Sequence, residues 1–416
     1  MSMVMGPFRV GRKGKMSVHR EAFDMTNQDT IPTVRLKNAF KSTHPWIFQR
    51  LVEKPAERIR PGTIVDVLNV DGSWLGRGFY NGHSRIAIRI LETDRHIPVD
   101  EAWFRAKIAT AVSLRRDVLE LDEITDAWRV VHSEGDGISG LVADRYGDLV
   151  VVEFFSAGAW RHRDWIFAAL SDAFPGCRFY SFAEEHVQKQ ESFDYRTSDP
   201  VAPSVITEYG VKFRADPAGA HKTGFFADQR ENREWLSRHV KGKRVLDLCC
   251  NTGGFGVYAA AKGGASEVHG IDIDQDVINI AKGNAKLNGA SIKFTQADIF
   301  PWLRDAANRG DFYDVVILDP AKMTRDRDQV IPALKKYLDM NKLAMSVLKP
   351  GGLFATFSCT GLVSEEQFLD MIRRAAFYGG RTVQILKVAG AGPDHPWLAQ
   401  VNESRYLKAV FCRVLD

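Results

Sequence analysis

Residues 244–256 read RVLDLCCNTGGFG, an apolar run that leads into an asparagine and three closely spaced glycines. A short apolar run followed by glycines predicts a buried strand over 244–248, a turn, and a helix over 257–262. Glycines let the backbone approach a ligand closely, so the turn is a candidate binding loop at the carboxyl end of the strand. Its spacing does not fit the G-x-G-x-x-G dinucleotide fingerprint.

Three further apolar runs follow, and each leads to an acidic residue: 267–272 to Asp272, 292–296 to Asp298, and 314–318 to Asp319. Segments of helical periodicity separate these runs, which favours a mainly parallel sheet wrapped by helices. Because parallel strands end at one edge of such a sheet, and ligands bind there, we expect the acids to lie close together. Asp272 can accept from both hydroxyls of a ribose, and Asp298 can accept from the amino group of an adenine whose ring Ile299 covers. The alternative for Asp272 and Asp298 is helix capping directly after a strand.

A thiol stands at the end of another predicted strand. Residues 349–361 read KPGGLFATFSCTG, so Cys359 directly follows an apolar run. A dehydrogenase would explain the first two strand ends but would have no clear use for Asp319 or Cys359, so we favour an adenosylmethionine site. A cysteine beside a methyl donor implies attack on carbon. The alternative for Cys359 is a small buried hydrophobe, whereas Cys249 and Cys250 are expected to pack beneath the binding loop.

Changes of pattern divide the chain. Its 416 residues exceed what one core ordinarily organises, and 45% of them are hydrophobic, which supports real cores. We expect four segments: a basic tail without periodicity over 1–31, a β-barrel-like module over 32–99, a small α+β domain over 100–207, and the α/β domain over 208–416. Within the third segment we expect one helix over 102–119.

The module over 32–99 combines cationic and aromatic side chains. Its basic residues include Arg35, Lys37, Lys41, Arg50, Arg58, Arg60, Arg77, Arg85 and Arg89, and its interleaved rings are His44, Trp46 and Phe48. This composition suits RNA, because cations meet phosphates and rings stack on unpaired bases. We take Arg35, Lys37, Lys41 and Trp46 as candidate RNA contacts. The alternative is that the rings belong to the core and the arginines to a solvated face.

The charge, cysteine spacing and hydropathy of the chain limit which partners and which cellular compartment we expect. The 56 basic and 52 acidic residues give a net charge of +4, so a polyanionic partner has to be argued from local clusters. The five cysteines show no C-x-x-C pair and no zinc-finger spacing, so we expect no metal site and a reducing cytoplasm. No apolar run approaches the ~18 to 20 residues of a membrane span, so we expect no membrane partner. A homodimer stays open.

Several motifs recur in the order found in one family. They are RLKNAF at 35–40, HPWIF at 44–48, KTGFFADQR at 222–230, TGGF at 252–255, DPAK at 319–322, TFSC at 356–359 and DHP at 394–396. As a set they resemble the bacterial large-subunit ribosomal RNA methyltransferases that form 5-methylcytosine in 23S rRNA, which carry an RNA-binding PUA domain in front. The resemblance covers the chain from about residue 32 to its end.

This resemblance implies a class I, Rossmann-like methyltransferase domain that uses S-adenosylmethionine (SAM), behind a PUA domain, with 23S rRNA as the partner. It places Phe226 and Gln229 at the methionine end of SAM. The other residues it assigns to the donor are Asn251, Thr252, Gly253 and Gly254 at the amino-acid portion, Asp272 at the ribose, and Asp298 and Ile299 at the adenine, with Ile273 and Asp319 also in contact.

Cys359 and Asp319 are the residues expected to carry the chemistry. C5 of cytosine is too weak a nucleophile to take a methyl group directly, so a thiolate must add at C6 first. Asp319 beside the adduct can hydrogen-bond a protonated cytosine N3; its alternative is donor positioning or loop structure only. Two further functions stay open: methylation of a base nitrogen on the same fold, which needs no thiol, and RNA binding by a protein with a decayed donor site.

The sequence departs from the family pattern after Asp319. Family members usually read Asp-Pro-Pro-Lys, whereas this chain has Ala321 in place of the second proline, so one ring that stiffens the loop is absent. Many other RNA cytosine-C5 methyltransferases carry a second cysteine after the proline pair, where this chain has Lys322.

Overall fold

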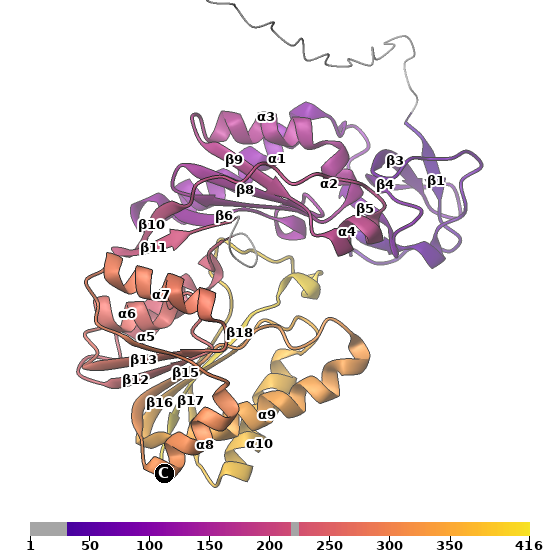
Figure 1. The fold of residues 1–416 in the computed structure, drawn as a ribbon. Helices are drawn as coiled ribbons and strands as arrows, with labels where there is room; N and C mark the ends of the chain where they lie inside the picture. The colour runs from indigo at the N-terminus through magenta and orange to yellow at the C-terminus, as the bar shows by residue number, and fades with distance from the viewer. Residues whose placement is uncertain (1–30, 218–223) are drawn as a thin grey trace, which may run out of the picture. The chain divides into compact units, whose positions relative to one another are not determined.

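The computed structural model describes residues 31–217 and 224–416 (Figure 1). The predicted basic tail, apart from Ile31, and the first two residues of the KTGFFADQR motif lie outside the described residues. The chain divides into two units at Ile31, and the second, Pro32–Asp416, is compact. All the elements described below belong to the second unit.

A five-stranded sheet begins the second unit. It consists of β1 (Thr33–Arg35), β2 (Trp46–Phe48), β3 (Thr63–Leu68), β4 (Trp74–Tyr80) and β5 (Ile86–Glu92), in the order β1-β3-β4-β5-β2, with the short 3-10 helix η1 (Gln49–Leu51). Alternation along the strands buries Val65, Val67 and Ile88 completely. These side chains form the core of the module.

Two arginines of this module are buried, contrary to the expectation of a solvated or RNA-contacting face. Arg77 donates from Nε to Asp66 Oδ1 at 2.8 Å. The Arg89 guanidinium lies 3.2 Å from the Glu191 carboxylate and 3.5 Å from that of Glu134. The counter-charges of Arg89 come from far along the chain, so the local pattern could not reveal this pairing.

A second sheet follows, in the order β6-β7-β8-β9. This part contains α1 (Glu101–Ser113), η3 (Leu121–Glu123), β6 (Ala127–His132), η4 (Ser133–Asp136), β7 (Leu141–Tyr146), β8 (Leu149–Phe154), α2 (Ala157–Arg161), α3 (Arg163–Ala173), β9 (Arg178–Phe182) and α4 (Glu185–Glu191). Its core is built around Phe104, Trp128 and Phe154, which are fully buried. The hairpin of β10 (Ser204–Glu208) and β11 (Val211–Ala215) leads into the last domain.

The helix predicted over 102–119 is not α-helical throughout. Helix α1 ends at Ser113, and a single π turn, η2 (Leu114–Val118), replaces its last part. Within that turn Arg115 is fully buried and pairs with Asp136 at 2.6 Å. It also donates to the backbone carbonyl of Asp394 at 2.6 Å. The wider turn therefore serves to direct a charged side chain inward, which helical periodicity does not predict.

A seven-stranded sheet forms the last domain, in the order β14-β13-β12-β15-β16-β18-β17. Its strands are β12 (Arg244–Leu248), β13 (Glu267–Asp272), β14 (Lys293–Gln296), β15 (Tyr313–Leu318), β16 (Leu348–Ser358), β17 (Val383–Ala389) and β18 (Lys408–Val414). The helices are α5 (Arg230–Ser237), α6 (Gly254–Ala261), α7 (Gln275–Leu287), α8 (Ile299–Arg309), α9 (Val330–Ser346) and α10 (Glu365–Gly379), with η5 (Ala227–Gln229), η6 (Arg327–Gln329) and η7 (Asn402–Ser404) between elements. The mainly parallel α/β sheet predicted from the sequence is confirmed; only β18 runs antiparallel, to both β16 and β17.

Helices cover both faces of this sheet, with α5, α6 and α7 on one side and α8, α9 and α10 on the other (Figure 1). Strands β12, β13, β15 and β16 pair in parallel, and Leu248 lies opposite both Ile271 and Leu318. Leu318 in turn lies opposite Thr356. The segments that leave these four strands therefore meet at one edge of the sheet.

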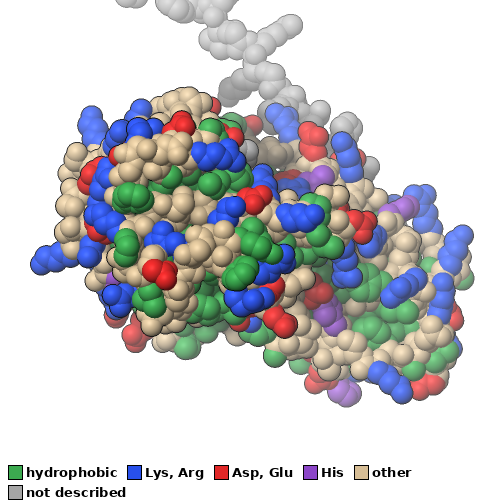
Figure 2. All heavy atoms as spheres, turned by 90° about the horizontal axis from the view of Figure 1, so that it is seen from below, with side chains coloured by type: hydrophobic (Ala, Val, Ile, Leu, Met, Phe, Trp, Pro, Cys, Tyr) green, Lys and Arg blue, Asp and Glu red, His purple; other side chains and the backbone are tan. Residues whose placement is uncertain are grey.

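The surface carries both signs of charge. On the face shown in Figure 2, Lys and Arg side chains are interspersed with Asp and Glu. Within residues 31–217 and 224–416, no helix combines the length and apolar character needed to cross a bilayer.

Candidate active site

The loop after β12 is tightly curled, and three of its residues adopt left-handed backbone angles: Cys249 (φ +57°), Asn251 (φ +47°) and Gly253 (φ +81°). Such angles cost ~1 to 3 kcal/mol each for residues with a side chain, so surrounding contacts must hold the loop. The Asn251 N–H donates to Asp272 Oδ2 at 2.9 Å, and the Asn251 side chain accepts from the Thr252 N–H at 2.7 Å. A Cβ on Gly253 would lie 3.1 Å from the Ala281 methyl group.

The acids predicted at the next two strand ends also bind backbone. Asp272 Oδ1 accepts from the Asp274 N–H at 3.0 Å, and Asp298 Oδ1 accepts from the Phe300 N–H at 2.9 Å as the N-cap of α8. The capping alternative is thus observed for Asp298. Because a carboxylate offers about four acceptor positions, both residues retain capacity for a ligand.

Asp247 is a site residue that the sequence analysis missed. It lies inside β12 with 1% exposure, its Oδ2 accepts from the Gly256 N–H at 2.8 Å, and its Oδ1 has no hydrogen-bond partner within the described part of the chain. Burial raises its pKa to about 8, with Asp319 and Asp272 adding to the effect. The raised pKa favours the protonated form of Asp247, which has an unsatisfied polar atom beneath the loop. The sequence signal that could have identified Asp247 is a single acidic residue inside the buried run 244–248.

These features fit an adenosyl group carrying an amino acid. The orphan Asp247 oxygen and the curled loop offer polar groups, and Asp272 lies beside them at the end of β13. Ile273 exposes 68% of its surface directly after Asp272, although it is a large apolar residue, whereas Ile299 is buried. An exposed isoleucine beside an acid suits an adenine next to its ribose.

Asp319 directly follows β15 and is held by a chain of amides. Gln229 donates from Nε2 to Asp319 Oδ2 at 3.0 Å, and its Oε1 accepts from Asn232 Nδ2 at 2.7 Å. Gln229 is 3% exposed, so both contacts are shielded from water. Phe226, also predicted at the donor, is half-buried three residues earlier. The structure thus brings Gln229 and Asp319 together, and it adds Asn232, which sequence reasoning did not identify.

Cys359 directly follows β16 and is half-buried. Its neighbours on both sides bind the buried hydroxyl of Tyr337: Ser358 donates to it at 3.0 Å, and Thr360 Oγ1 lies 2.9 Å away. Thr360 Oγ1 also accepts from the Met323 N–H at 3.0 Å. One threonine therefore links the segment of Cys359 to the loop that follows Asp319.

Lys408 at the start of β18 is a second residue that the sequence analysis missed. It is 3% exposed, and its Nζ donates to the carbonyls of Thr360 (2.6 Å) and Tyr406 (2.8 Å). It has no carboxylate within ion-pair distance among residues 31–217 and 224–416. Burial lowers its pKa to about 8, while the negative charge of Cys359 opposes that change. A buried cation therefore lies in the electrostatic field of the candidate nucleophile.

The DHP motif anchors the donor side of the site. Asp394 is fully buried and accepts from Arg230 Nη2 at 2.7 Å, and its backbone carbonyl binds Arg115. Burial alone would raise the pKa of Asp394, but His395 and Arg230 hold it well below its usual value. Because Arg230 directly follows Gln229, this network fixes the residue that contacts Asp319.

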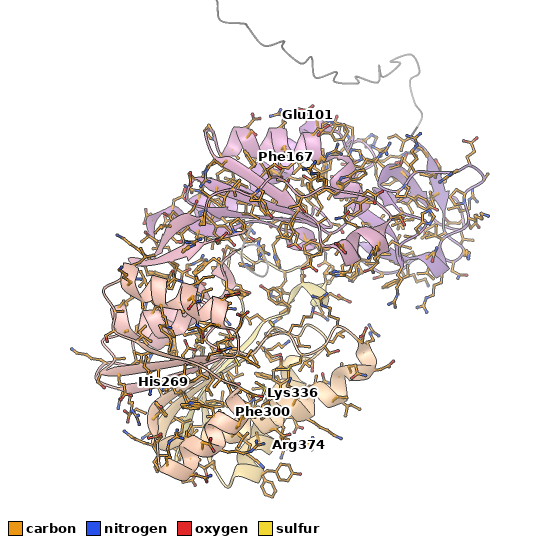
Figure 3. The ribbon with its side chains drawn as sticks, viewed as in Figure 1. Glu101, Phe167, His269, Phe300, Lys336 and Arg374 are labelled. Carbon is orange, nitrogen blue, oxygen red and sulfur yellow. The ribbon has the colours of Figure 1, made fainter. Side chains whose placement is uncertain are left out.

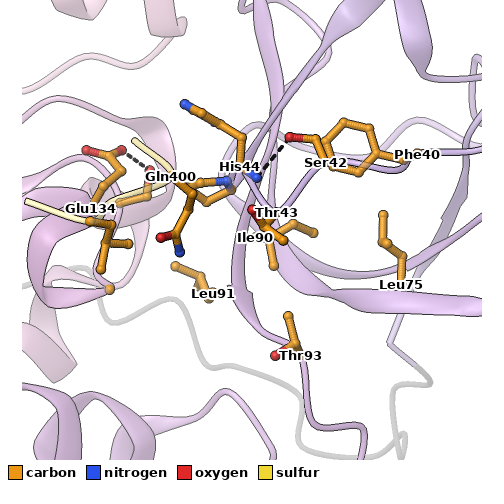
Figure 4. A pocket seen from close by; sticks show the side chains of 14 residues that line it. Phe40, Ser42, Thr43, His44, Leu75, Ile90, Leu91, Thr93, Glu134 and Gln400 are labelled. Carbon is orange, nitrogen blue, oxygen red and sulfur yellow. Dashed lines mark hydrogen bonds between the residues drawn. The ribbon is translucent and has the colours of Figure 1, made fainter. Parts of the chain in front are cut away.

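The predicted RNA contacts lie at the front module. Arg35, Lys37 and Lys41 are exposed. Trp46 is half-buried, and its indole N–H donates to Glu134 Oε1 at 2.8 Å, so the structure shows an internal contact for this ring. Glu134 also lines a cavity of about 200 Å³, whose other walls come from the front module, from Gly137 and Ser139, and from the segment near residue 400 (Figure 4).

Comparisons with known proteins agree with this architecture. Residues 174–387 match the family model of S-adenosylmethionine-dependent methyltransferases, and residues 34–93 match that of PUA-like domains. Two solved structures share the fold: the candidate methyltransferase SMU.776 with S-adenosylhomocysteine (TM-score 0.78, 21% identity, covering 92% of this chain and 100% of that one) and a candidate SAM-dependent methyltransferase from Streptococcus mutans (TM-score 0.76, 19% identity, 92% and 100% covered).

Curated relatives match most of the chain. "Ribosomal RNA large subunit methyltransferase I" of Aeromonas hydrophila is 38% identical over 379 residues, which are 89% of this chain and 95% of the relative. The proteins of the same name from Vibrio cholerae (38% over 387 residues; 91% and 97%) and Klebsiella pneumoniae (36% over 380 residues; 89% and 94%) are similar to the same extent. The predicted fold class, a SAM-dependent methyltransferase domain behind a PUA-like domain, is confirmed, and SAM is the methyl donor. This chain belongs to the ribosomal RNA large subunit methyltransferase I family.

Proposed function

We propose that this methyltransferase forms 5-methylcytosine in large-subunit (23S) ribosomal RNA, with Cys359 as nucleophile. The observation that carries the proposal is that Cys359 leaves β16 at the sheet edge where the donor loop and Asp319 leave β12 and β15. The names of the relatives, the PUA-like domain and the exposed Arg35, Lys37 and Lys41 support RNA as the substrate. Such a substrate implies work in the cytoplasm, where the five cysteines would stay reduced.

The chemistry follows from the electron demand of cytosine. The Cys359 thiolate adds to C6, so that an S–C6 bond forms and the electrons of the C5–C6 double bond move to C5. SAM, when bound, supplies an electrophilic methyl group to C5 and is left as S-adenosylhomocysteine. Removal of the C5 proton by a base returns its electron pair to the ring, which restores the C5–C6 double bond and expels the Cys359 thiolate.

Three residues around Cys359 have roles in this proposal. Lys408 attracts the thiolate electrostatically, and a nearby cation is a general means of stabilising that form of cysteine. Asp319, held by Gln229, is oriented to accept a hydrogen bond from the protonated N3 of the cytosine adduct. Tyr337 fixes both neighbours of the nucleophile. Binding, orientation and charge stabilisation are therefore supplied by separate side chains.

The deciding experiment is product analysis combined with adduct trapping. Incubation with labelled SAM and protein-free large-subunit RNA, followed by digestion to nucleosides, should give 5-methylcytidine. RNA that contains 5-fluorocytidine cannot release a C5 proton, so it should form a denaturant-stable complex with the protein. Cys359→Ala should abolish the product and the complex, whereas Cys177→Ala, at a half-buried cysteine of the central domain, should retain both.

Two outcomes would overturn the proposal. A base with a methylated nitrogen, still formed by Cys359→Ala, would establish nitrogen methylation on the same fold. A lack of SAM binding in calorimetry would establish an RNA-binding protein with a decayed donor site.

A further inference from the structure

A second cavity adjoins the candidate active site. The loop after β15 and the first turns of α9 line an open cavity of about 460 Å³, within the ~300 to 1,000 Å³ range of small-ligand pockets. Lys322, Arg325 and Lys336 contribute to its wall, and Asp326 is its only acidic lining residue among those the structure describes. Figure 3 labels Lys336 on α9. We call this cavity the Lys322 cleft.

Two cations of this cleft, Arg325 and Lys336, are available for an anionic ligand. Neither Arg325 nor Lys336 lies within ion-pair distance of a carboxylate in the described part of the chain. Within the described residues, the Arg325 guanidinium has His186 of α4 as its side-chain hydrogen-bond partner, with the His186 Nε2 3.4 Å away. Arg325 and Lys336 together outnumber Asp326, the one acidic lining residue in the described part of the chain, so this wall of the cleft attracts anions.

The cleft is also electrostatically close to the reacting groups. Lys322 stands three residues after Asp319, and its charge contributes to the lowered pKa of Lys408, below the larger effect of burial. Burial raises the pKa of Cys249 at the donor loop, and Lys336 opposes that rise. Met323, which lines the cleft, donates its N–H to Thr360 Oγ1 at 3.0 Å, so the cleft borders the segment of Cys359.

We propose that the Lys322 cleft binds backbone phosphates of the RNA strand next to the target base. The inference rests on the proposed RNA substrate and adds a site that the front module does not provide. A base that enters the active site carries its sugar-phosphate backbone with it, so negative charge must lie at the mouth of the site. Lysine and arginine neutralise such phosphates, and each neutralised phosphate releases counterions.

Salt dependence tests this site directly. Binding of a large-subunit RNA fragment is measured by fluorescence anisotropy over a series of salt concentrations. For single-stranded contacts, the slope of log affinity against log salt concentration changes by about 0.7 per phosphate contact. The double variant Arg325→Glu/Lys336→Glu should therefore bind more weakly at low salt, with a slope shallower by about 1.4.

The chain offers matched controls. Arg327 and Lys335 are exposed neighbours of the two cleft cations, and neither lines the cleft. Arg327→Glu/Lys335→Glu makes the same change in net charge and should keep a slope close to that of the wild type. An unchanged slope in the cleft variant, or an equal change in the control, overturns the proposal. Should charge reversal impair folding, the neutral pair Arg325→Gln/Lys336→Gln replaces it, with the same expected change in slope.

The result is separable from the outcome for Cys359. If the slope changes but the product is methylated on nitrogen, the phosphate site stands and the cytosine-C5 mechanism fails. If 5-methylcytidine forms but the cleft variant keeps the wild-type slope, the mechanism stands and the phosphate site fails. Calorimetry with SAM should give the wild-type affinity for the cleft variant, because none of its changes lies in the donor loop.

Discussion

Asp394 should be among the most important single residues for stability, because its carboxylate compensates a fully buried guanidinium. Arg230 binds it at 2.7 Å, the Arg129 N–H binds its other oxygen at 2.9 Å, and both Asp394 and Arg230 have no exposed surface. Removing one partner of a buried ion pair costs about 3 to 5 kcal/mol. Arg230 would keep its contact with Glu231, at 3.0 Å from Nε, so we expect the lower end, about 3 kcal/mol, for Asp394→Asn.

Urea unfolding followed by circular dichroism measures this loss. With a urea dependence of about 3 kcal/mol per molar for a chain of this size, the midpoint should fall by about 1 M. Asp370→Asn is the control, because Asp370 forms an exposed pair with Arg373, at 2.6 Å, that should contribute less than about 1 kcal/mol. If Asp394→Asn behaves like this control, the buried pair does not hold the domain as we argue.

The pH dependence of the same variant isolates the electrostatic part. The folded state holds the pKa of Asp394 below the value of about 3.9 that an unfolded aspartate has. Its stabilisation is therefore fully present above that value and is lost as pH falls through the lower, folded pKa. The difference in stability between wild type and Asp394→Asn should be constant near neutral pH and shrink below about pH 4. A constant difference down to strong acid would contradict the argument.

Three further predictions concern the site itself. Lys408→Met should slow iodoacetamide alkylation of Cys359 several-fold at pH 7, as measured by peptide mass spectrometry, and Lys408→Arg should restore most of the rate; the effect should vanish above about pH 8, where Lys408 loses its proton. Tyr337→Phe should destabilise the protein by about 1 to 3 kcal/mol in urea unfolding, because its hydroxyl binds two buried neighbours; a neutral change would exclude this role. Asp272→Ala should weaken SAM binding in calorimetry by roughly tenfold or more, whereas Asp276→Ala in the first turn of α7 should not.

The sheet and its ligand edge were predictable because they follow from local patterns. Each of these predictions used only a few consecutive residues. They are the run RVLDL, the acids after three apolar stretches, and the thiol after a fourth. Parallel pairing then brings Asp272, Asp319 and Cys359 to one edge without further information.

The missed residues depend on partners far along the chain. Lys408 is recognisable only once β18 pairs with β16. This pairing brings Lys408 next to Thr360, which lies 48 residues earlier in the chain. The sequence shows Trp46 only as an aromatic residue. Its internal role depends on Glu134, 88 residues later in the chain, which accepts a hydrogen bond from the indole N–H. A pattern confined to one strand or helix cannot contain such contacts, and the same reasoning explains why Arg89 was expected at the surface.

Thr360 has a consequence for attempts to redirect this enzyme to another base. Its side chain joins Tyr337 to the Met323 N–H, and its carbonyl holds Lys408, so one residue couples three elements of the active site. Changing the nucleobase preference by altering the Asp319 loop alone would therefore also shift Cys359, the proposed nucleophile. Successful engineering would have to exchange both segments as a matched pair, or leave this threonine and its three connections intact.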